Sequence, residues 1–184
     1  MRKNLGSKPY LCPQLVLIIG TYDKDGNPNA MNAAWGGMAD YDKVMICMSS
    51  HKTTDNIAIN NEFTISIGDA SHVCECDYVG IVSQKNEPNK MVKSKFTTSK
   101  SEFVNAPIIN ELPLCLECKL LKIIDEELYI AQIINVNADE SILDEKGNVS
   151  LEKFIPIVYE PATHGYYMVQ GRVGNAFSDG NKLK

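Results

Sequence analysis

The sequence predicts a mainly β fold of antiparallel strands, either a barrel or a sandwich. Short apolar runs separated by turn residues recur along most of the chain, which is typical of strands joined by hairpins. Helical patterns are few and do not alternate with the strand patterns, as they would in a parallel, doubly wound sheet. Antiparallel sheets that close on themselves or stack in pairs fit this pattern best.

The first third of the chain predicts a hairpin and two more strands. Residues 14–22 form an apolar run that ends near Asp25-Gly26, a strong hairpin signal, and the chain returns through Asn29 to Trp35. Gly36-Gly37 interrupts the pattern. Two further strands are expected at 44–48 and at 63–67, with Phe63, Ile65 and Ile67 of the second on one face.

A helix is expected between these last two strands. It begins near Lys52, with Ser49 or Ser50 as the N-cap, buries Ile57, and ends at Asn60-Asn61. Only a weak helical pattern follows in residues 70–101.

The second half predicts a longer hairpin and then shorter strands. Residues 112–136 contain two strand patterns joined by the acidic turn 125–127. Short strands are expected at 155–159 and 165–169.

Length and charge limit the possible functions. With 184 residues the chain is long enough for one domain, residues 1–184. The net charge of -5 is spread without a basic block, so a nucleic-acid surface is not expected. No apolar run approaches the roughly 20 residues of a membrane span, and none resembles a signal peptide. We expect a cytoplasmic protein that does not bind membranes.

The six cysteines include Cys115 and Cys118, whose spacing is that of a redox or zinc motif. Residues three apart on a strand point to opposite faces, so this pair could not hold one metal ion together. We therefore favour reduced cysteines that act as small apolar residues, and we expect no metal site.

Two segments point to a flavin mononucleotide (FMN). The small residues of 29–35 would let a flat ring lie against the backbone. The loop 49–54 is rich in hydroxyl groups, carries Lys52, and precedes the expected helix, whose free N–H groups and positive dipole end favour a phosphate.

The chain also resembles the flavin reductase-like, FMN-binding split-barrel family, and within it the flavoredoxin branch. No single matching sign is specific, but their order and spacing are. They are Thr21-Tyr-Asp with Gly26, 29–35 with Gly36-Gly37, His51-Lys-Thr53 with Asn56-Ile57, Val79-Gly80 with Ser83, Lys90, Ala106-Pro107, Leu116-Glu-Cys118, Pro156, Tyr166-Tyr167, and Gly174-Asn-Ala-Phe177 with Gly180.

The resemblance implies a six-stranded antiparallel split barrel of Greek-key type with a few short flanking helices. It also implies a homodimer with FMN at the dimer interface. The ring would contact Asn32, Ala33, Ala34 and Trp35, and the ribityl chain and phosphate would contact Ser49, Ser50, His51, Lys52, Thr53 and Thr54. Ser83 and Lys90 complete the implied cofactor contacts.

Plainer interpretations stand beside these assignments. Trp35 could equally be a core aromatic, and Ser49 or Ser50 could simply cap a helix while His51 and Lys52 face solvent. Of Tyr166 and Tyr167, which alternate on a strand, one would face the ligand and the other the core. Family members often have other residues at the positions of Gln84 and Asn89, so this segment departs from the family pattern.

The expected activity follows from the cofactor, because a flavin accepts hydride and can pass on single electrons. We expect an FMN-dependent oxidoreductase of flavin reductase type, with no catalytic side chain, that takes electrons from NAD(P)H or from a redox protein. No Gly-x-Gly-x-x-Gly fingerprint is present, so a nicotinamide would dock transiently. The alternatives are a flavoredoxin-like electron carrier without significant NAD(P)H turnover, and a barrel that has lost its flavin.

Overall fold

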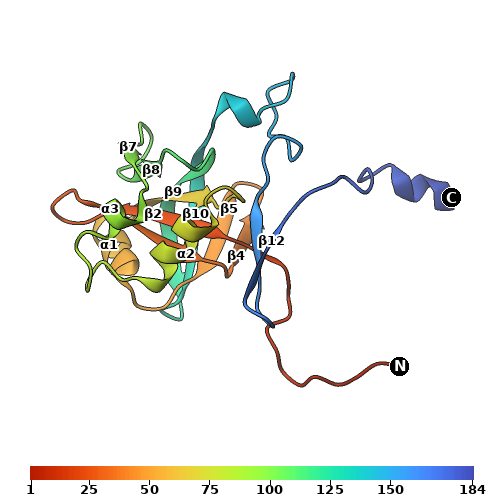
Figure 1. Ribbon diagram of the computed structural model, residues 1–184, viewed down its shortest axis with the longest axis horizontal. Coiled ribbons are helices and arrows are strands. Elements are labelled where there is room, and N and C mark those ends of the chain that lie inside the picture. Colours follow the sequence, from red (N-terminus) through yellow and green to blue (C-terminus); the bar gives the residue numbers. More distant parts are fainter.

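The hairpin predicted at Asp25-Gly26 joins the first two long strands of the protein. The computed structural model describes residues 1–184 (Figure 1). Strand β2 (Leu17–Tyr22) pairs antiparallel with β3 (Pro28–Ala33). The Asp23 carboxylate accepts two backbone N–H bonds across the turn, and Gly26 has the positive φ of +82° that the turn requires.

The main sheet has seven strands in the order β3-β2-β6-β9-β10-β5-β4, and every pairing is antiparallel. The mainly β split-barrel fold is therefore confirmed, with seven strands in this sheet rather than six. The remaining strands are β4 (Gly36–Asp40), β5 (Lys43–Cys47), β6 (Glu62–Ile67), β9 (Leu114–Ile124) and β10 (Leu128–Ala138).

The extra strand begins at the glycine pair that the sequence pattern treats as a break. A side chain on Gly36 would lie 2.8 Å from Leu17 and 2.9 Å from the Met45 carbonyl oxygen. Glycine lets β4 approach its neighbours here, so the pair starts a strand instead of ending the sheet.

Two small sheets complete the β structure. β1 (Gln14–Leu15), β11 (Ile157–Glu160) and β12 (Gly165–Met168) form one, and β7 (Thr98–Lys100) pairs with β8 (Pro107–Ile109) in the other. The predicted strand 14–22 is thus divided between two sheets. In Figure 1, β12 lies at the edge of the body, and both chain ends extend away from it.

Three helices flank the main sheet: α1 (Lys52–Asn60), α2 (Val73–Ile81) and α3 (Lys90–Ser94). Two 3-10 turns lie at η1 (Glu140–Ile142) and η2 (Asp179–Leu183). None of these helices combines the length and the apolar composition that crossing a membrane requires.

The boundaries of α1 correct one detail and confirm another. The N-cap is His51, not Ser49 or Ser50, because His51 is the residue with extended backbone whose N–H and C=O bond to the Thr54 hydroxyl. The helix ends at Asn61, which adopts the left-handed conformation, as the Asn60-Asn61 pair predicts.

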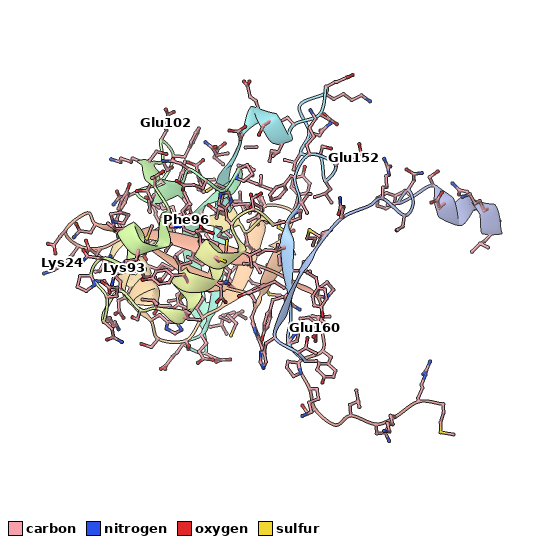
Figure 2. All side chains as sticks on the ribbon, in the orientation of Figure 1. Lys24, Lys93, Phe96, Glu102, Glu152 and Glu160 are labelled. Carbon is pink, nitrogen blue, oxygen red and sulfur yellow. The ribbon has the colours of Figure 1, made fainter.

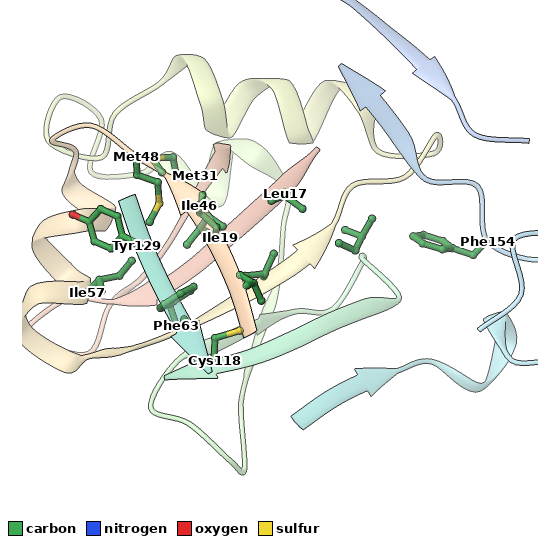
Figure 3. Packing of buried hydrophobic residues seen from close by; sticks show 14 of the residues in the cluster. Leu17, Ile19, Met31, Ile46, Met48, Ile57, Phe63, Cys118, Tyr129 and Phe154 are labelled. Atoms are coloured by element: carbon green, nitrogen blue, oxygen red, sulfur yellow. The ribbon is translucent and has the colours of Figure 1, made fainter. Parts of the chain in front are cut away.

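Strand β2 separates two apolar cores. Leu17 and Ile19 pack into a cluster inside the barrel, which also holds the predicted row Phe63, Ile65 and Ile67 (Figure 3). The alternate residues Val16 and Ile18 pack on the other side. That second cluster includes Cys76, Val79, Met91 and Phe96 from α2, α3 and the segment after α3. Helices α2 and α3 are thereby held against one face of the sheet beside β3.

The cysteines occupy separate environments. Cys115 pairs in register with Ser66, and Cys118 pairs with Phe63, so the two side chains point to opposite faces of the sheet as predicted. Burial raises the pKa of Cys115 to about 11 and that of Cys76 to about 12. All six thiols are free, and the buried ones stay protonated at neutral pH.

Candidate functional site

Two adjoining cavities lie where β3, the N-terminus of α1, α2 with the segment after it, and the sheet of β11 and β12 come together. We call the first the β3 pocket, with a volume of about 280 Å³, and the second the Lys90 pocket, with about 210 Å³. Met31, Asn32 and His51 line both. The β3 pocket is further lined by Ala33, Ala34, Trp35, Cys47, Met48, Ser49, Tyr159 and Tyr166. The Lys90 pocket is further lined by Asn29, Lys52, Thr53, Val79, Gly80, Ile81, Val82, Ser83, Gln84 and Lys90.

The structure gathers most of the predicted contact residues around these cavities. All of them except Ser50 and Thr54 line one pocket or both. Ser50 is exposed and lines neither. Thr54 is buried and serves the helix: its Oγ1 accepts a bond from the His51 N–H and donates one to the His51 carbonyl oxygen, each at 2.8 Å.

The first turn of α1 presents unpaired donors to the Lys90 pocket. The first helical hydrogen bond runs from the Asp55 N–H to the His51 carbonyl oxygen at 3.1 Å. The amides of Lys52 and Thr53 precede it and therefore have no partner within the helix. Together with the positive end of the helix dipole, these groups favour an anion at this end of the pocket.

Lys90 is a buried cation without a carboxylate partner. Its side chain is 3 % exposed, and no Asp or Glu oxygen lies within salt-bridge distance of its ammonium group. Burial lowers the pKa of Lys90 to about 8. A buried charge is costly unless it is paired, so this position calls for an anion.

Two buried acceptors also lie at the Lys90 pocket. Asn29 Nδ2 donates to Thr53 Oγ1 at 2.8 Å, and Gln84 Nε2 donates to the Pro28 carbonyl oxygen at 3.2 Å. The carbonyl oxygens of both side chains, Asn29 Oδ1 and Gln84 Oε1, have no hydrogen-bond partner. Unpartnered buried acceptors are rare and favour a ligand that carries hydroxyl or N–H donors.

Asn32 is held between α2 and β12. Its Nδ2 donates to the Cys76 carbonyl oxygen at 3.0 Å and to Tyr166 Oη at 3.4 Å. A side chain on Gly80 would lie 2.9 Å from the Asn32 Cβ, so glycine is needed for the helix to come this close. Asn32 Oδ1 is left as the free acceptor of the amide.

The hydroxyl of Tyr166 donates to Asp77 Oδ1 at 2.8 Å. Burial is the largest cause that raises the pKa of Tyr166, and the bond to Asp77 adds to it. Tyr166 thus faces the β3 pocket in its neutral form. Tyr167, the alternating residue, is 54 % exposed, so the prediction that one of the two tyrosines is a core residue was wrong. The reason is that β12 lies in a small sheet at the edge of the body, whose far face is open to solvent.

Trp35 is not a core residue either. Its side chain is 55 % exposed, and the residue lies between the end of β3 and the start of β4. It lines the β3 pocket and also an apolar cavity of about 290 Å³ on the other side. That cavity is further lined by Pro9, Leu11, Gln14, Gly36, Met45, Cys47, Leu128, Tyr159 and Pro161.

Comparison with known proteins decides the family. The model of the flavin reductase-like domain matches residues 10–166 of the chain. The chain belongs to this family.

Similar proteins agree with that result. The flavoredoxin of Desulfovibrio vulgaris (Miyazaki F) is 34 % identical, with a TM-score of 0.94 over 98 % of this chain and 100 % of the other. The flavoredoxin of Methanosarcina acetivorans is 25 % identical, with a TM-score of 0.85 over 100 % and 98 %. An uncharacterised protein of Aquifex aeolicus is 27 % identical over 156 residues, 79 % of each chain. The resemblance to the flavoredoxin branch is confirmed.

Several lining residues of this flavin reductase-like domain could not be recognised from the sequence. Met31, Met48 and Val79 are apolar residues within or next to regular elements, where the same pattern predicts core. Asn29 is the first residue of the small-residue segment 29–35, and only this position in the sequence indicates that it lies at the site. Gln84 and Asn89 both depart from the family pattern. Gln84 lines the Lys90 pocket, whereas Asn89 is exposed and lines neither pocket.

Proposed function

We propose that the protein binds FMN and acts as an oxidoreductase of flavin reductase type. In this proposal the ring of the flavin occupies the β3 pocket and the phosphate occupies the Lys90 pocket. The observation that carries the proposal is the buried residue Lys90, whose ammonium has no carboxylate partner and which lines a cavity that shares three lining residues with the β3 pocket. A phosphate supplies the negative charge that this group lacks.

The donors around Lys90 suit a phosphate. Lys52 also lines the Lys90 pocket, the amides at the start of α1 are free, and the hydroxyl hydrogens of Thr53 and Ser83 can donate there. A cofactor phosphate would bring between one and two negative charges to this place. The net charge of the protein is -5, so local donors must supply the attraction.

The unpartnered acceptors distinguish a phosphorylated polyol from a bare anion. Asn29 Oδ1 and Gln84 Oε1 can accept from hydroxyl groups, whereas an anion without O–H groups offers them no hydrogen. The ribityl chain of FMN carries hydroxyl groups between ring and phosphate, and so provides these donors next to the anionic end.

The β3 pocket suits a flat ring. Ala33 and Ala34 are half-buried and small, so a ring can approach the backbone there. Asn32 Oδ1 offers an acceptor at the junction of the two pockets. Bound FMN would supply the capacity to take up hydride or electrons from NAD(P)H or a redox protein and to pass them on. The residues of this chain bind and orient it.

An absorbance spectrum tests the proposal directly. The purified protein, or the flavin-free protein titrated with FMN, is expected to show a protein-bound flavin band between about 350 and 500 nm. Riboflavin, which lacks the phosphate, is the matched ligand and should bind at least tenfold more weakly. Equal affinity for both ligands, or no binding of FMN, would contradict the proposal.

A second candidate function is a flavoredoxin-like electron carrier, favoured by the likeness to the two flavoredoxins. Rapid bleaching of the bound flavin by NADH or NADPH, with turnover, supports the reductase. Slow bleaching by both nucleotides, with fast reduction by a low-potential redox protein, supports the carrier.

We also propose that the protein is a homodimer. The N-terminal arm (residues 1–13) and the C-terminal arm (residues 170–184) lead out of the body, and most of the length of each extends away from it (Figures 1 and 2). Leu11, Val173, Phe177 and Leu183 in these arms are each at least 86 % exposed. Apolar residues exposed in this way favour contact with a second chain, and two-fold homodimers are the commonest assemblies.

The six free thiols also support the proposal of a cytoplasmic location, because reduced cysteines are typical of that compartment.

A further inference from the structure

Asp77 carries a negative charge that no cation neutralises. It lies on α2, and no lysine or arginine nitrogen approaches its carboxylate within salt-bridge distance. Its one side-chain partner is Tyr166, whose hydroxyl donates to Asp77 Oδ1 at 2.8 Å. Tyr166 in turn lines the β3 pocket. A single hydrogen bond therefore links the Asp77 carboxylate to a residue of the pocket wall.

This bond also settles what Tyr166 can offer the pocket. A tyrosine hydroxyl has one hydrogen, and Asp77 receives it. Tyr166 Oη can then only accept, which it does from Asn32 Nδ2 at 3.4 Å. The second hydrogen of that amide goes to the Cys76 carbonyl oxygen at 3.0 Å. As a result, Asn32 presents Oδ1, and both polar groups at this wall are acceptors.

We infer that Asp77 and Tyr166 are positioning residues that lower the reduction potential of the flavin. This inference rests on the proposed binding of FMN in the β3 pocket. Two-electron reduction of FMN takes up one or two protons, and when only one is taken up the ring gains a negative charge. The carboxylate of Asp77 and the acceptor oxygens of Asn32 and Tyr166 oppose that charge, because like charges repel each other. The lysines of the Lys90 pocket are engaged by the phosphate in this arrangement and offset the charge of Asp77 only in part.

The test measures the midpoint potential of bound FMN by reductive titration with dithionite, which supplies both electrons while protons come from solvent. Asp77→Asn keeps a group that can accept from Tyr166 but removes the charge. We expect its potential to rise, so that the ratio of reduced to oxidised flavin at a fixed potential increases about tenfold, or about 30 mV for two electrons.

Glu75→Gln is the matched control. It removes a carboxylate that lies two residues away on the same helix and is not hydrogen-bonded to Tyr166 or Asn32. We expect its potential to equal that of the wild type. A rise of the same size in both variants would mean that only net charge matters, and this result would overturn the inference.

A second measurement needs no flavin. In the flavin-free protein, the side-chain amide resonances of Asn32 should shift in Tyr166→Phe, which removes one acceptor, and in Asp77→Asn, but not in Glu75→Gln. Unchanged resonances in both of the first two variants would overturn the positioning role. Failure of the wild type to bind FMN refutes the proposed function itself. Binding of FMN with equal potentials in wild type and Asp77→Asn refutes only the tuning.

Discussion

At the scale of single residues, the candidate site is defined by polar groups that the fold buries without partners. Lys90 lacks a carboxylate, while Asn29 Oδ1 and Gln84 Oε1 lack donors. Native proteins rarely leave such groups unpaired, because each costs stability. A ligand that brings both an anion and hydroxyl groups removes these costs together, so binding of such a ligand would stabilise the protein.

The first prediction concerns the pH dependence of FMN binding. The pKa of Lys90 is lowered to about 8, so its ammonium is present below that pH and is lost above it. The affinity for FMN should therefore stay nearly constant from pH 7 to about 8. It should then weaken by up to tenfold per pH unit until the higher pKa that Lys90 has beside a bound phosphate is reached. Fluorescence titration of FMN at several pH values measures this.

The second prediction concerns Lys90→Met. This variant should lose about 1.5 to 3 kcal/mol of FMN binding at pH 7, the usual worth of a hydrogen bond to a charged group, and should lose the pH dependence above 8. The flavin-free variant should unfold at a higher temperature, because a buried unpaired charge is gone. Lys93→Met is the control, since Lys93 is exposed and bonded to Glu87 on the protein surface. Unchanged affinity in Lys90→Met would place the phosphate elsewhere.

At the scale of elements, two helices position the site by contacts that depend on small or hydroxyl residues. α2 approaches β3 where Gly80 meets Asn32, and α1 begins at the capping bonds between His51 and Thr54. The first contact sets the wall shared by the two pockets. The second sets where the free amides of α1 begin.

The third prediction concerns Gly80→Ala. The added methyl group would lie 2.9 Å from the Asn32 Cβ, so α2 or β3 must move. We expect a loss of about 1 to 3 kcal/mol in the free energy of unfolding, measured in urea, together with weaker FMN binding. Gly37→Ala is the control, because nothing lies within 4 Å of the added atom. If the two variants were equally stable, the close packing of α2 on Asn32 would be refuted.

The fourth prediction concerns the start of α1. Thr54→Val keeps the shape of the side chain but removes both hydrogen bonds to His51. We expect a cost of about 1 kcal/mol in unfolding free energy, as for other lost helix caps, and a weaker affinity for FMN as the first turn frays. Thr98→Val, on β7 and without a side-chain hydrogen bond, should cost less. A Thr54→Val variant as stable as the wild type would argue against the capping role.

At the scale of the whole molecule, the body and the arms differ in how they are held. The body has two apolar cores on either side of β2, whereas the arms expose large apolar residues. The alignment with the Desulfovibrio vulgaris flavoredoxin covers 98 % of this chain, so it includes most of both arms. Most of each arm therefore follows a path that a solved structure shares.

The fifth prediction is that the wild type elutes as a dimer in size-exclusion chromatography with light scattering. Removal of residues 170–184 should give a monomer at micromolar concentration, with the circular dichroism of the folded body retained. Phe177→Ser should weaken the dimer, whereas Lys182→Ser, at a polar position of the same arm, should not. A monomeric wild type, or a truncated chain that stays dimeric, would contradict the assembly that we propose.

Much of the fold could be predicted from local patterns. The hairpin at Asp25-Gly26, the helix that ends at Asn60-Asn61 and the opposite faces of Cys115 and Cys118 all follow from turn chemistry and strand periodicity. The seventh strand could not be predicted in this way, because the role of Gly36 depends on how closely Leu17 and Met45 approach it. Trp35 and Tyr167 were open to a core interpretation because an apolar side chain looks the same in sequence whether it is buried or exposed.

The sequence by itself determined the antiparallel β class, the family, and the two segments, 29–35 and 49–54, that border the cavities. These features follow from the order of neighbouring residues. Only the tertiary structure decided that Lys90 is buried without a carboxylate, that Gln84 and Asn29 present unpaired oxygens, and that Asp77 reaches the pocket through Tyr166. Such properties depend on which groups the fold brings together from distant parts of the chain, and on how completely it removes them from water.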